Sequence, residues 1–217
     1  TTQDGVIVVI HDDTIDRTTD GSGRVQDLIF AELQSYDAAY DWSPPAAPDT
    51  YPYRGQGVTV PALEDVLEAF PDMPMVIEIK QREPSMVVPF CDLLREHDMQ
   101  DKVLIATFHA QTISEVRQQC PEFAHSGVQD DILPFFVLHM LGLSAAYHSP
   151  SYAFQIPEQF SGIQVVSPRF VADAQRHNID VHVWTINNRD DMQRLIDMGV
   201  DGIITDYPDV MLTLLGR

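Results

Sequence analysis

The chain has 217 residues, 44% hydrophobic and 21% charged, which is enough to bury one sizeable core, and a single globular domain over residues 1–217 is predicted. Thirty-three acidic residues against thirteen basic ones give a formal net charge of −20, which repels phosphate backbones and anionic membrane surfaces at long range. We therefore expect no nucleic-acid partner. A phosphate-bearing ligand would need local neutralisation by a metal ion or by a few well-placed cations.

Short β-branched runs alternate with helical patterns along most of the chain. In chain order, strands are predicted at residues 6–11, 75–80, 103–108, 180–187 and 202–206, and helices at residues 86–97, 111–119 and 190–198. This alternation predicts a parallel sheet covered by helices, either a doubly wound sheet or a (β/α)8 barrel. No glycine-rich phosphate loop follows any predicted strand, which weakens the nucleotide-binding alternative. The Pro-rich stretch at residues 43–53 is interpreted as an irregular surface excursion.

The predicted strand at residues 75–80 has the sequence MVIEIK. Because side chains alternate between the two faces of a strand, Glu78 and Lys80 lie on the same face. They are at the carboxyl end of the strand, where barrel enzymes build their active sites. A carboxylate there can hold a hard cation, and the lysine can meet a phosphate oxygen. The alternative from these residues alone is an ion pair that only closes a layer of the barrel interior.

A histidine, His11, ends the first predicted strand and is followed by acids. Because an imidazole titrates near neutral pH, a histidine at this place is a candidate general acid or base. His182 shares a predicted strand face with Trp184 and is interpreted as a core histidine or as one that supports the site residues from below. The remaining histidines have loop or helical surroundings and are interpreted as structural: His97, His109, His125, His139, His148 and His177.

Two cysteines, Cys91 and Cys120, lie in helical contexts without paired spacing, so we expect both to be reduced and buried. The sequence contains neither a signal peptide nor an apolar run of eighteen residues. A cytoplasmic protein is the expectation.

Three ordered sequence blocks carry a family resemblance. Residues 11–25 (HDDTIDRTTDGSGRV) resemble the histidine-bearing motif of the glycerophosphodiester phosphodiesterases. Residues 60–67 (VPALEDVL) with residues 77–80 (IEIK) match the second block of that family. Residues 183–187 (VWTIN) with residues 199–208 (GVDGIITDYP) match its two closing strands.

The resemblance implies a TIM (β/α)8 barrel of the phospholipase-C-like phosphodiesterase type that uses a divalent cation, Mg²⁺ or Ca²⁺. It implies hydrolysis of a glycerophosphodiester to sn-glycerol 3-phosphate and an alcohol by histidine acid/base catalysis. By the same resemblance His11 is the second of two catalytic histidines and Glu78 is one of three acidic metal ligands. Lys80 would contact the phosphate, and Trp184 would line the glycerol end of the pocket.

The family's first strand ends in a His-Arg-Gly motif, followed by Pro-Glu-Asn-Thr and two further acids, and none of these occurs in the chain. The resemblance therefore implies that the first strand, first helix and second strand of the barrel are lacking. On this interpretation the chain is N-terminally incomplete and inactive by itself. A non-catalytic barrel remnant that serves as a binding or structural module is the alternative.

Residues 132–147 (ILPFFVLHMLGLSAAY) are unusually apolar but too short to span a bilayer comfortably. They are expected to form an apolar wall or lid for a lipid tail, with peripheral membrane contact, or else an ordinary buried helix. This apolar segment is similar to that of the family branch that acts as lysophospholipase D on lysophospholipids, a resemblance that favours the wall or lid.

Overall fold

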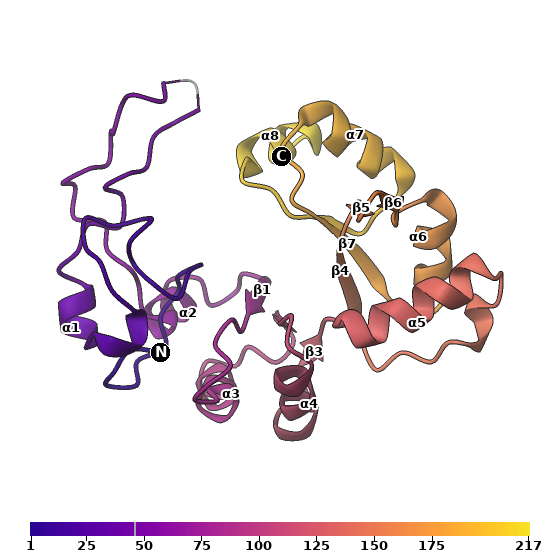
Figure 1. Cartoon of the computed structure of the whole chain (residues 1–217), viewed down its shortest axis with the longest axis horizontal. Helices are drawn as coiled ribbons and strands as arrows, with labels where there is room; N and C mark the ends of the chain where they lie inside the picture. Colours follow the sequence, from indigo (N-terminus) through magenta and orange to yellow (C-terminus); the bar gives the residue numbers. More distant parts are fainter. Residues whose placement is uncertain (46) are drawn as a thin grey trace. The chain divides into compact units, whose positions relative to one another are not determined.

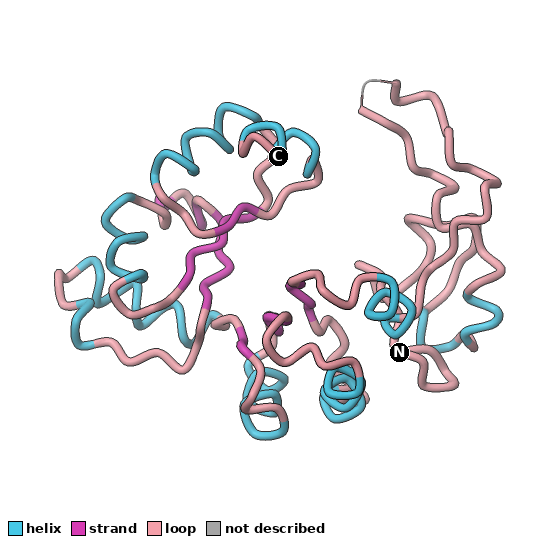
Figure 2. Tube along the Cα trace, turned by 180° about the vertical axis from the view of Figure 1, so that it is seen from behind, coloured by secondary structure: helices cyan, strands magenta, loops and turns pink. Residues whose placement is uncertain are grey.

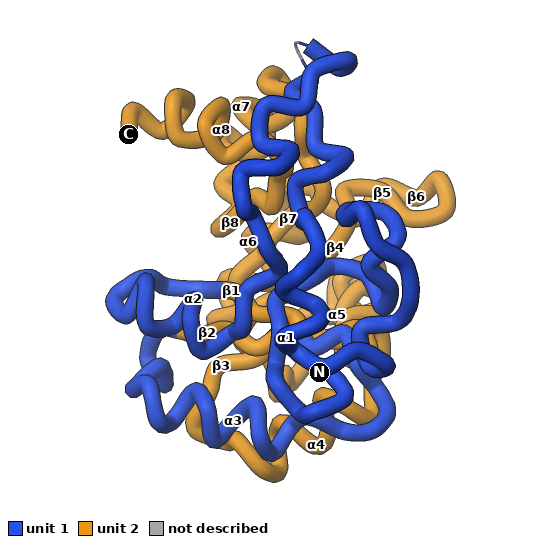
Figure 3. Tube along the Cα trace, turned by 90° about the vertical axis from the view of Figure 1, so that its left-hand side faces the viewer, with its two compact units in different colours: residues 1–75, 79–102 blue, residues 76–78, 103–217 orange. Residues whose placement is uncertain are grey.

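The structure is a computed structural model that describes residues 1–45 and 47–217 (Figures 1 and 2). It divides into two compact units (Figure 3). Unit 1 comprises Thr1–Met75 and Ile79–Lys102, and unit 2 comprises Val76–Glu78 and Val103–Arg217.

The elements of unit 1 are mainly short helices separated by turns. They are η1 (Val25–Asp27), α1 (Phe30–Leu33), α2 (Leu63–Ala69) and α3 (Val87–Glu96). Strand β1 (Met75–Glu78) begins at the last residue of the first segment of unit 1 and continues into unit 2.

The elements of unit 2 alternate between strands and helices. The first are β2 (Val103–Ala106), α4 (Ala110–Gln119), β3 (Ala124–His125), α5 (Gln129–Met140), η2 (Ser144–Ala146) and β4 (Ala153–Pro157). The hairpin strands β5 (Gln159–Phe160) and β6 (Ile163–Gln164) follow. The last are α6 (Pro168–Gln175), β7 (Asp180–Trp184), α7 (Arg189–Met198), β8 (Gly202–Ile203) and α8 (Pro208–Leu214).

The strand order follows the chain order. One sheet has the order β1-β2-β3 and a second has the order β4-β7-β8, and a parallel bridge between Ser126 and Ala153 joins β3 to β4. The β2–β3, β4–β7 and β7–β8 pairs are parallel. An order without reversal is typical of (β/α)8 barrels and not of doubly wound sheets. Within the described residues the strands form no closed barrel, and the absence of the first strand, first helix and second strand stays a prediction.

The main core of unit 2 lies between the strands and their covering helices. Phe154 and Ile156 of β4 and Val181 and Val183 of β7 are buried in it, and alternate residues of both strands face the other way. Helices α5 and α6 run along one side of β4 and β7 (Figure 1) and contribute buried side chains such as Phe135. This packing leaves the opposite face of the sheet available for polar residues.

Most of the predicted elements are confirmed within a few residues, but the strand predicted at residues 6–11 is wrong. This segment makes only an isolated antiparallel bridge, between Val8 and Ala62. The Val9 amide donates to the carbonyl of Pro61 at 3.0 Å, yet Pro61 has no N–H with which to return the bond. The ladder therefore stops after one bridge.

The excursion at residues 43–53 contains no helix or strand among its described residues, as predicted, and Ala46 lies outside the described residues. Asp37 closes its base, because its two carboxylate oxygens accept hydrogen bonds from the Ala39 amide (2.9 Å) and the Gly55 amide (2.6 Å). Next to this base the guanidinium carbon of Arg54 lies 4.1 Å from the ring centre of Tyr40 and 3.8 Å from that of Tyr51.

The two cysteines are both fully buried, as predicted, but the prediction that they are reduced is wrong. Cys91 and Cys120 are disulfide-bonded, and no free cysteine remains among the described residues. The spacing of cysteines along a chain does not show whether each of them forms a disulfide, because that depends on geometry in three dimensions. Separately, none of the helices in the described ranges has both the length and the apolar character needed to cross a membrane.

Candidate active site

A cavity of about 440 Å³ opens in unit 2, at the carboxyl ends of consecutive strands. The strands contribute Glu78 as the last residue of β1, Thr107 after β2, Ser126 after β3, Gln155 to Pro157 of β4 and Trp184 as the last residue of β7. This is the end at which (β/α)8 enzymes build their active sites. The cavity is consequently the candidate active site.

Helix α5 and the β5–β6 hairpin make the apolar part of the cavity. Ile132, Leu133 and Phe136 line it from the helix, and Phe160 and Ile163 line it from the hairpin. Residue Leu133 is 54% exposed and residue Phe160 is 61% exposed, so both lie at the rim. An apolar wall beside a few polar groups is the usual composition of a small-molecule site.

The predicted site residue Trp184 occupies the last position of β7 and lines the cavity. Its ring packs edge-on against Phe108, with the ring centres 5.8 Å apart. Its buried indole nitrogen has no hydrogen-bond partner among the described residues. A buried indole N–H normally has an acceptor, so this donor calls for an explanation.

The imidazole of His182 lies on the same strand face as Trp184. A Cβ atom on Gly202, the paired residue of β8, would lie 2.7 Å from the His182 ring, so glycine is needed for the close approach of the two. Burial lowers the pKa of His182, which favours the neutral imidazole in the folded protein. His182 is only partly buried, on the strand face that looks away from the main core of unit 2.

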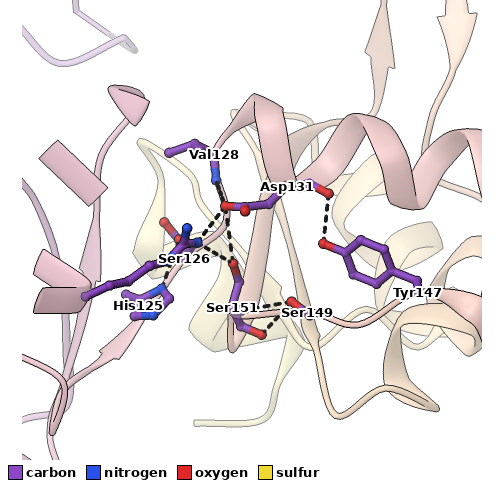
Figure 4. Close-up of polar contacts among 8 residues, drawn as sticks. His125, Ser126, Val128, Asp131, Tyr147, Ser149 and Ser151 are labelled. Carbon is purple, nitrogen blue, oxygen red and sulfur yellow. Dashed lines mark hydrogen bonds and ion pairs between the residues drawn. The ribbon is translucent and has the colours of Figure 1, made fainter. Parts of the chain in front are cut away.

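A polar network holds the first turn of α5, the helix that supplies the apolar wall (Figure 4). The Asp131 carboxylate accepts hydrogen bonds from Arg117 Nη2 at 2.7 Å and from the Val128 amide at 3.0 Å. The Tyr147 hydroxyl donates to the Asp131 carbonyl at 2.8 Å, and Ser151 Oγ lies 3.2 Å from Arg117 Nη2. These bonds fix the start of α5 relative to the loop before β4.

His11 lies in unit 1 with a side chain that is 73% exposed. Its Nδ1 atom lies 2.7 Å from Asp12 Oδ1, and Arg17 Nε donates to Asp12 Oδ2 at 2.5 Å. The hydrogen bonds from Arg17 and then from His11 lower the pKa of Asp12 to about 2, so this carboxylate is ionised at neutral pH. An ionised carboxylate on Nδ1 leaves Nε2 of His11 as the nitrogen that can exchange a proton.

The remainder of the 11–25 motif is a scaffold for this loop. Thr14 and Arg24 form an antiparallel bridge, and the Ile15 side chain between them is fully buried in the unit 1 core. The buried Thr19 hydroxyl donates to the Ile15 carbonyl at 2.9 Å. Thr14, Ile15, Thr19 and Arg24 of the motif thus stabilise the loop.

The structure brings together two of the four predicted site residues. Glu78 and Trp184 line the same cavity of unit 2, whereas His11 and Lys80 belong to unit 1 and are not placed with respect to that cavity. Glu78 and Lys80 are both half-buried and both have interaction partners.

The described residues do not assemble the three acidic ligands implied for a divalent cation. Across residues 1–45 and 47–217, no group of three or more His, Cys, Asp or Glu side chains is positioned to hold a metal ion. Glu78 is the one carboxylate among the described residues that line the cavity, and a single carboxylate falls short of the oxygen ligands that Mg²⁺ or Ca²⁺ require. The residues present therefore do not fit a complete metal site.

Sequence reasoning missed Gln155, which lines the cavity from β4. Its side-chain nitrogen is buried and has no hydrogen-bond partner among the described residues. The sequence does show one amide side chain within the apolar run AFQIP at residues 153–157. A buried amide in such a run is expected to have a hydrogen-bond acceptor.

The curated relatives span the chain at moderate identity. A glycerophosphodiester phosphodiesterase of Caldanaerobacter subterraneus subsp. tengcongensis is 27% identical over 100% of this chain and 83% of its own length. One from Bacillus subtilis is 30% identical over 96% of this chain and 72% of its own length. A human lysophospholipase D is 22% identical over 95% of this chain and 72% of its own length.

Solved structures show the same fold, and a family model identifies the chain. The glycerophosphoryl diester phosphodiesterase domain of a Mycobacterium tuberculosis protein superposes with a TM-score of 0.82 at 18% identity, covering 100% of this chain and 85% of that one. An Oleispira antarctica phosphodiesterase in complex with the product sn-glycerol-3-phosphate gives 0.72 at 22% identity, covering 100% and 82%. The model of the glycerophosphoryl diester phosphodiesterase family matches residues 1–210. The chain therefore belongs to the glycerophosphoryl diester phosphodiesterase family.

Proposed function

We propose that this protein hydrolyses glycerophosphodiesters to sn-glycerol 3-phosphate and an alcohol, with residues 1–217 belonging to one catalytic domain. The observation that supports this most directly is the convergence of Glu78 and Trp184 on one cavity at the carboxyl ends of the strands, in a chain of this family. The relatives named as glycerophosphodiester phosphodiesterases, and the Oleispira antarctica complex with sn-glycerol-3-phosphate, support the substrate class.

In the proposed reaction an oxygen nucleophile, either water or the glycerol hydroxyl, attacks phosphorus. The P–O bond to the alcohol breaks, and the alcohol leaves with a proton. We assign the proton transfer to Nε2 of His11, whose Nδ1 is held by Asp12. Lys80 is proposed to pair with a phosphate oxygen and Trp184 to bound the glycerol end. If water is the nucleophile, one of its protons goes to the leaving alcohol and the other passes to solvent. If the glycerol hydroxyl is the nucleophile, its proton goes to the leaving alcohol and a five-membered cyclic phosphate forms. Water then opens this ring to sn-glycerol 3-phosphate, with one proton returned to the glycerol oxygen and the other released to solvent.

Three sequence-based predictions remain predictions: binding of Mg²⁺ or Ca²⁺ with Glu78 as a ligand, a cytoplasmic location, and peripheral membrane contact through residues 132–147. Exposed apolar side chains of Val137, Met140 and Leu141 support the last of these.

The test is release of sn-glycerol 3-phosphate from glycerophosphocholine with Mg²⁺ or Ca²⁺, by this chain and by the product of its full reading frame. Release that depends on His11 supports the proposal. Silence from both proteins, once circular dichroism shows that they are folded, would favour the non-catalytic barrel remnant instead.

A second candidate substrate class is the lysophospholipids. The apolar wall made by Ile132, Leu133 and Phe136 supports it, because such a wall can shield an acyl chain from water. Leu133→Ser removes an exposed part of this wall at little cost in stability. It should raise KM for lysophosphatidylcholine several-fold and leave KM for glycerophosphocholine unchanged. Equal effects on both substrates would argue against an acyl chain on this wall.

A further inference from the structure

Three buried side-chain nitrogen atoms lack a hydrogen-bond partner among the described residues, and two of them lie in the walls of one cavity. They are Gln155 Nε2 and Trp184 Nε1; the third is Arg117 Nε, outside the cavity. Buried polar atoms in native proteins nearly always have a partner, because an unpaired buried donor is costly. Two such donors in one cavity point to a ligand that supplies the acceptors.

Strand geometry directs both side chains to the cavity. Strands β4 and β7 are paired in parallel, with Gln155 opposite His182 and Pro157 opposite Trp184. The alternate residues Phe154 and Val183 are fully buried in the core on the other face. Gln155 and Trp184 therefore share the face that looks away from the core.

The chemistry of the cavity narrows what these two donors bind. Most of the lining is apolar, so the amide and the indole are two fixed polar points on a hydrophobic wall. Both are uncharged N–H donors, which suit a hydroxyl, ester or phosphoryl oxygen. An apolar group placed against them would leave both donors unpaired, whereas an oxygen atom restores both hydrogen bonds.

We propose that Gln155 is a substrate-binding residue whose side-chain N–H, together with the indole N–H of Trp184, donates to oxygen atoms of the glycerol phosphate part of the substrate. This inference rests on the proposed function and adds a specificity-determining residue to it. Neither donor has a partner among the described residues, and we expect the bound ligand to supply both acceptors.

Binding can be measured at Trp184 itself. The chain has two tryptophans, so a ¹⁵N-labelled sample gives two indole signals, which a Trp42→Phe variant assigns. Titration with sn-glycerol 3-phosphate should shift the Trp184 signal and leave that of Trp42, an exposed residue of unit 1, in place. An unmoved Trp184 signal at saturating ligand would overturn the inference.

The role of Gln155 is tested by Gln155→Leu, which keeps the size of the side chain and removes the donor. The affinity for sn-glycerol 3-phosphate and kcat/KM for glycerophosphocholine should each fall about tenfold, the loss of one hydrogen bond to a ligand. The melting temperature should stay level or rise, because an unpaired buried donor has been removed. Gln118→Leu, an exposed position on α4, is the matched control and should change neither affinity nor turnover.

The outcomes separate this inference from the proposed function. Wild-type hydrolysis with an unaffected Gln155→Leu variant overturns the role of Gln155 and leaves the proposed function standing. A fall in activity that merely follows a fall in melting temperature also overturns it, because the residue is then structural. Failure of the folded wild-type protein to bind or hydrolyse the substrate overturns both.

Discussion

The Nδ1 atom of His139 lies 2.6 Å from Oδ2 of Asp173, and both side chains are buried, with 7% and 3% of their surfaces exposed. The pair links α5 to α6, and Arg176 Nη1 reaches the other oxygen of Asp173 at 2.6 Å. Burial by itself raises the pKa of Asp173, but the hydrogen bond from His139 and the charge of Arg176 outweigh this effect and leave the pKa lowered.

This pair predicts a loss of stability in acid. Because the pKa of Asp173 is lower in the folded than in the unfolded protein, its contribution is present above about pH 4 and is lost as the pH falls through the folded value. Asp173→Asn should lower the free energy of unfolding at pH 7 by about 3 kcal/mol, since it leaves a buried pair broken. Urea unfolding at pH 7 and pH 3 measures both effects, with the exposed Asp101→Asn as control. A variant as stable as wild type at pH 7 would contradict the prediction.

Removing His11 should affect turnover and not folding. His11→Ala is expected to lower kcat for glycerophosphocholine by about 10²–10⁴-fold, the usual contribution of a general acid or base. The side chain is 73% exposed, so the melting temperature should hardly change. The exposed His148→Ala provides the control for loss of an imidazole. If kcat survives in folded His11→Ala, the acid/base assignment is wrong.

Glu78 is the residue through which the cation prediction can be tested. Glu78→Gln keeps the shape of the side chain and removes its charge, so cation affinity and turnover should both fall, with partial rescue by added Mg²⁺ or Ca²⁺. Isothermal titration with each metal, followed by the activity assay, gives two independent measurements. Wild-type values in both would remove Glu78 from the set of metal ligands.

Replacing Lys80 should change binding and turnover together. Lys80→Met keeps most of the apolar stem and removes the ammonium, which is proposed to hold the phosphate in both the ground and transition states. We expect KM for glycerophosphocholine to rise and kcat to fall, each by about tenfold, as for the loss of one charge-assisted hydrogen bond. Lys80→Arg should recover part of the activity. Unchanged kinetics in Lys80→Met would refute the role.

The network at the start of α5 should contribute to stability and to the cavity wall. Asp131→Asn weakens the ion pair with Arg117 and the hydrogen bond from the Val128 amide, and should lower the free energy of unfolding by about 1–2 kcal/mol. Because α5 lines the cavity, KM for lysophosphatidylcholine should rise at temperatures where the variant is fully folded. Denaturant unfolding and steady-state kinetics test these two effects. The neighbouring exposed Asp130→Asn is the control.

The alternation of strands and helices could be predicted from the sequence because it depends on the local spacing of apolar residues. Helix α7 (Arg189–Met198), predicted at residues 190–198, begins after Asn188, whose side chain accepts hydrogen bonds from the Asp190 and Asp191 amides. The segment at residues 6–11 was mispredicted because its pairing depends on a proline fifty residues away, which local patterns do not reveal.

The site was only partly predictable for the same reason. Glu78 and Trp184 could be placed at strand ends from their own strands. Features that depend on contacts in three dimensions could not, such as the pairing of His139 with Asp173, or the buried Gln155 amide nitrogen that has no partner among the described residues. Chemistry within one element can be predicted from sequence, whereas contacts between elements require the fold.

The Asp37 closure has an evolutionary consequence. The Asp37 carboxylate accepts a hydrogen bond from the backbone on each side of the Pro-rich excursion. A change of length within the excursion should therefore leave the packed part of unit 1 unaltered. Doubling the length of such a closed segment costs only about 0.6 kcal/mol of closure entropy. Insertions should therefore accumulate at this tip among homologues, and the tip offers a tolerant place to graft a peptide tag.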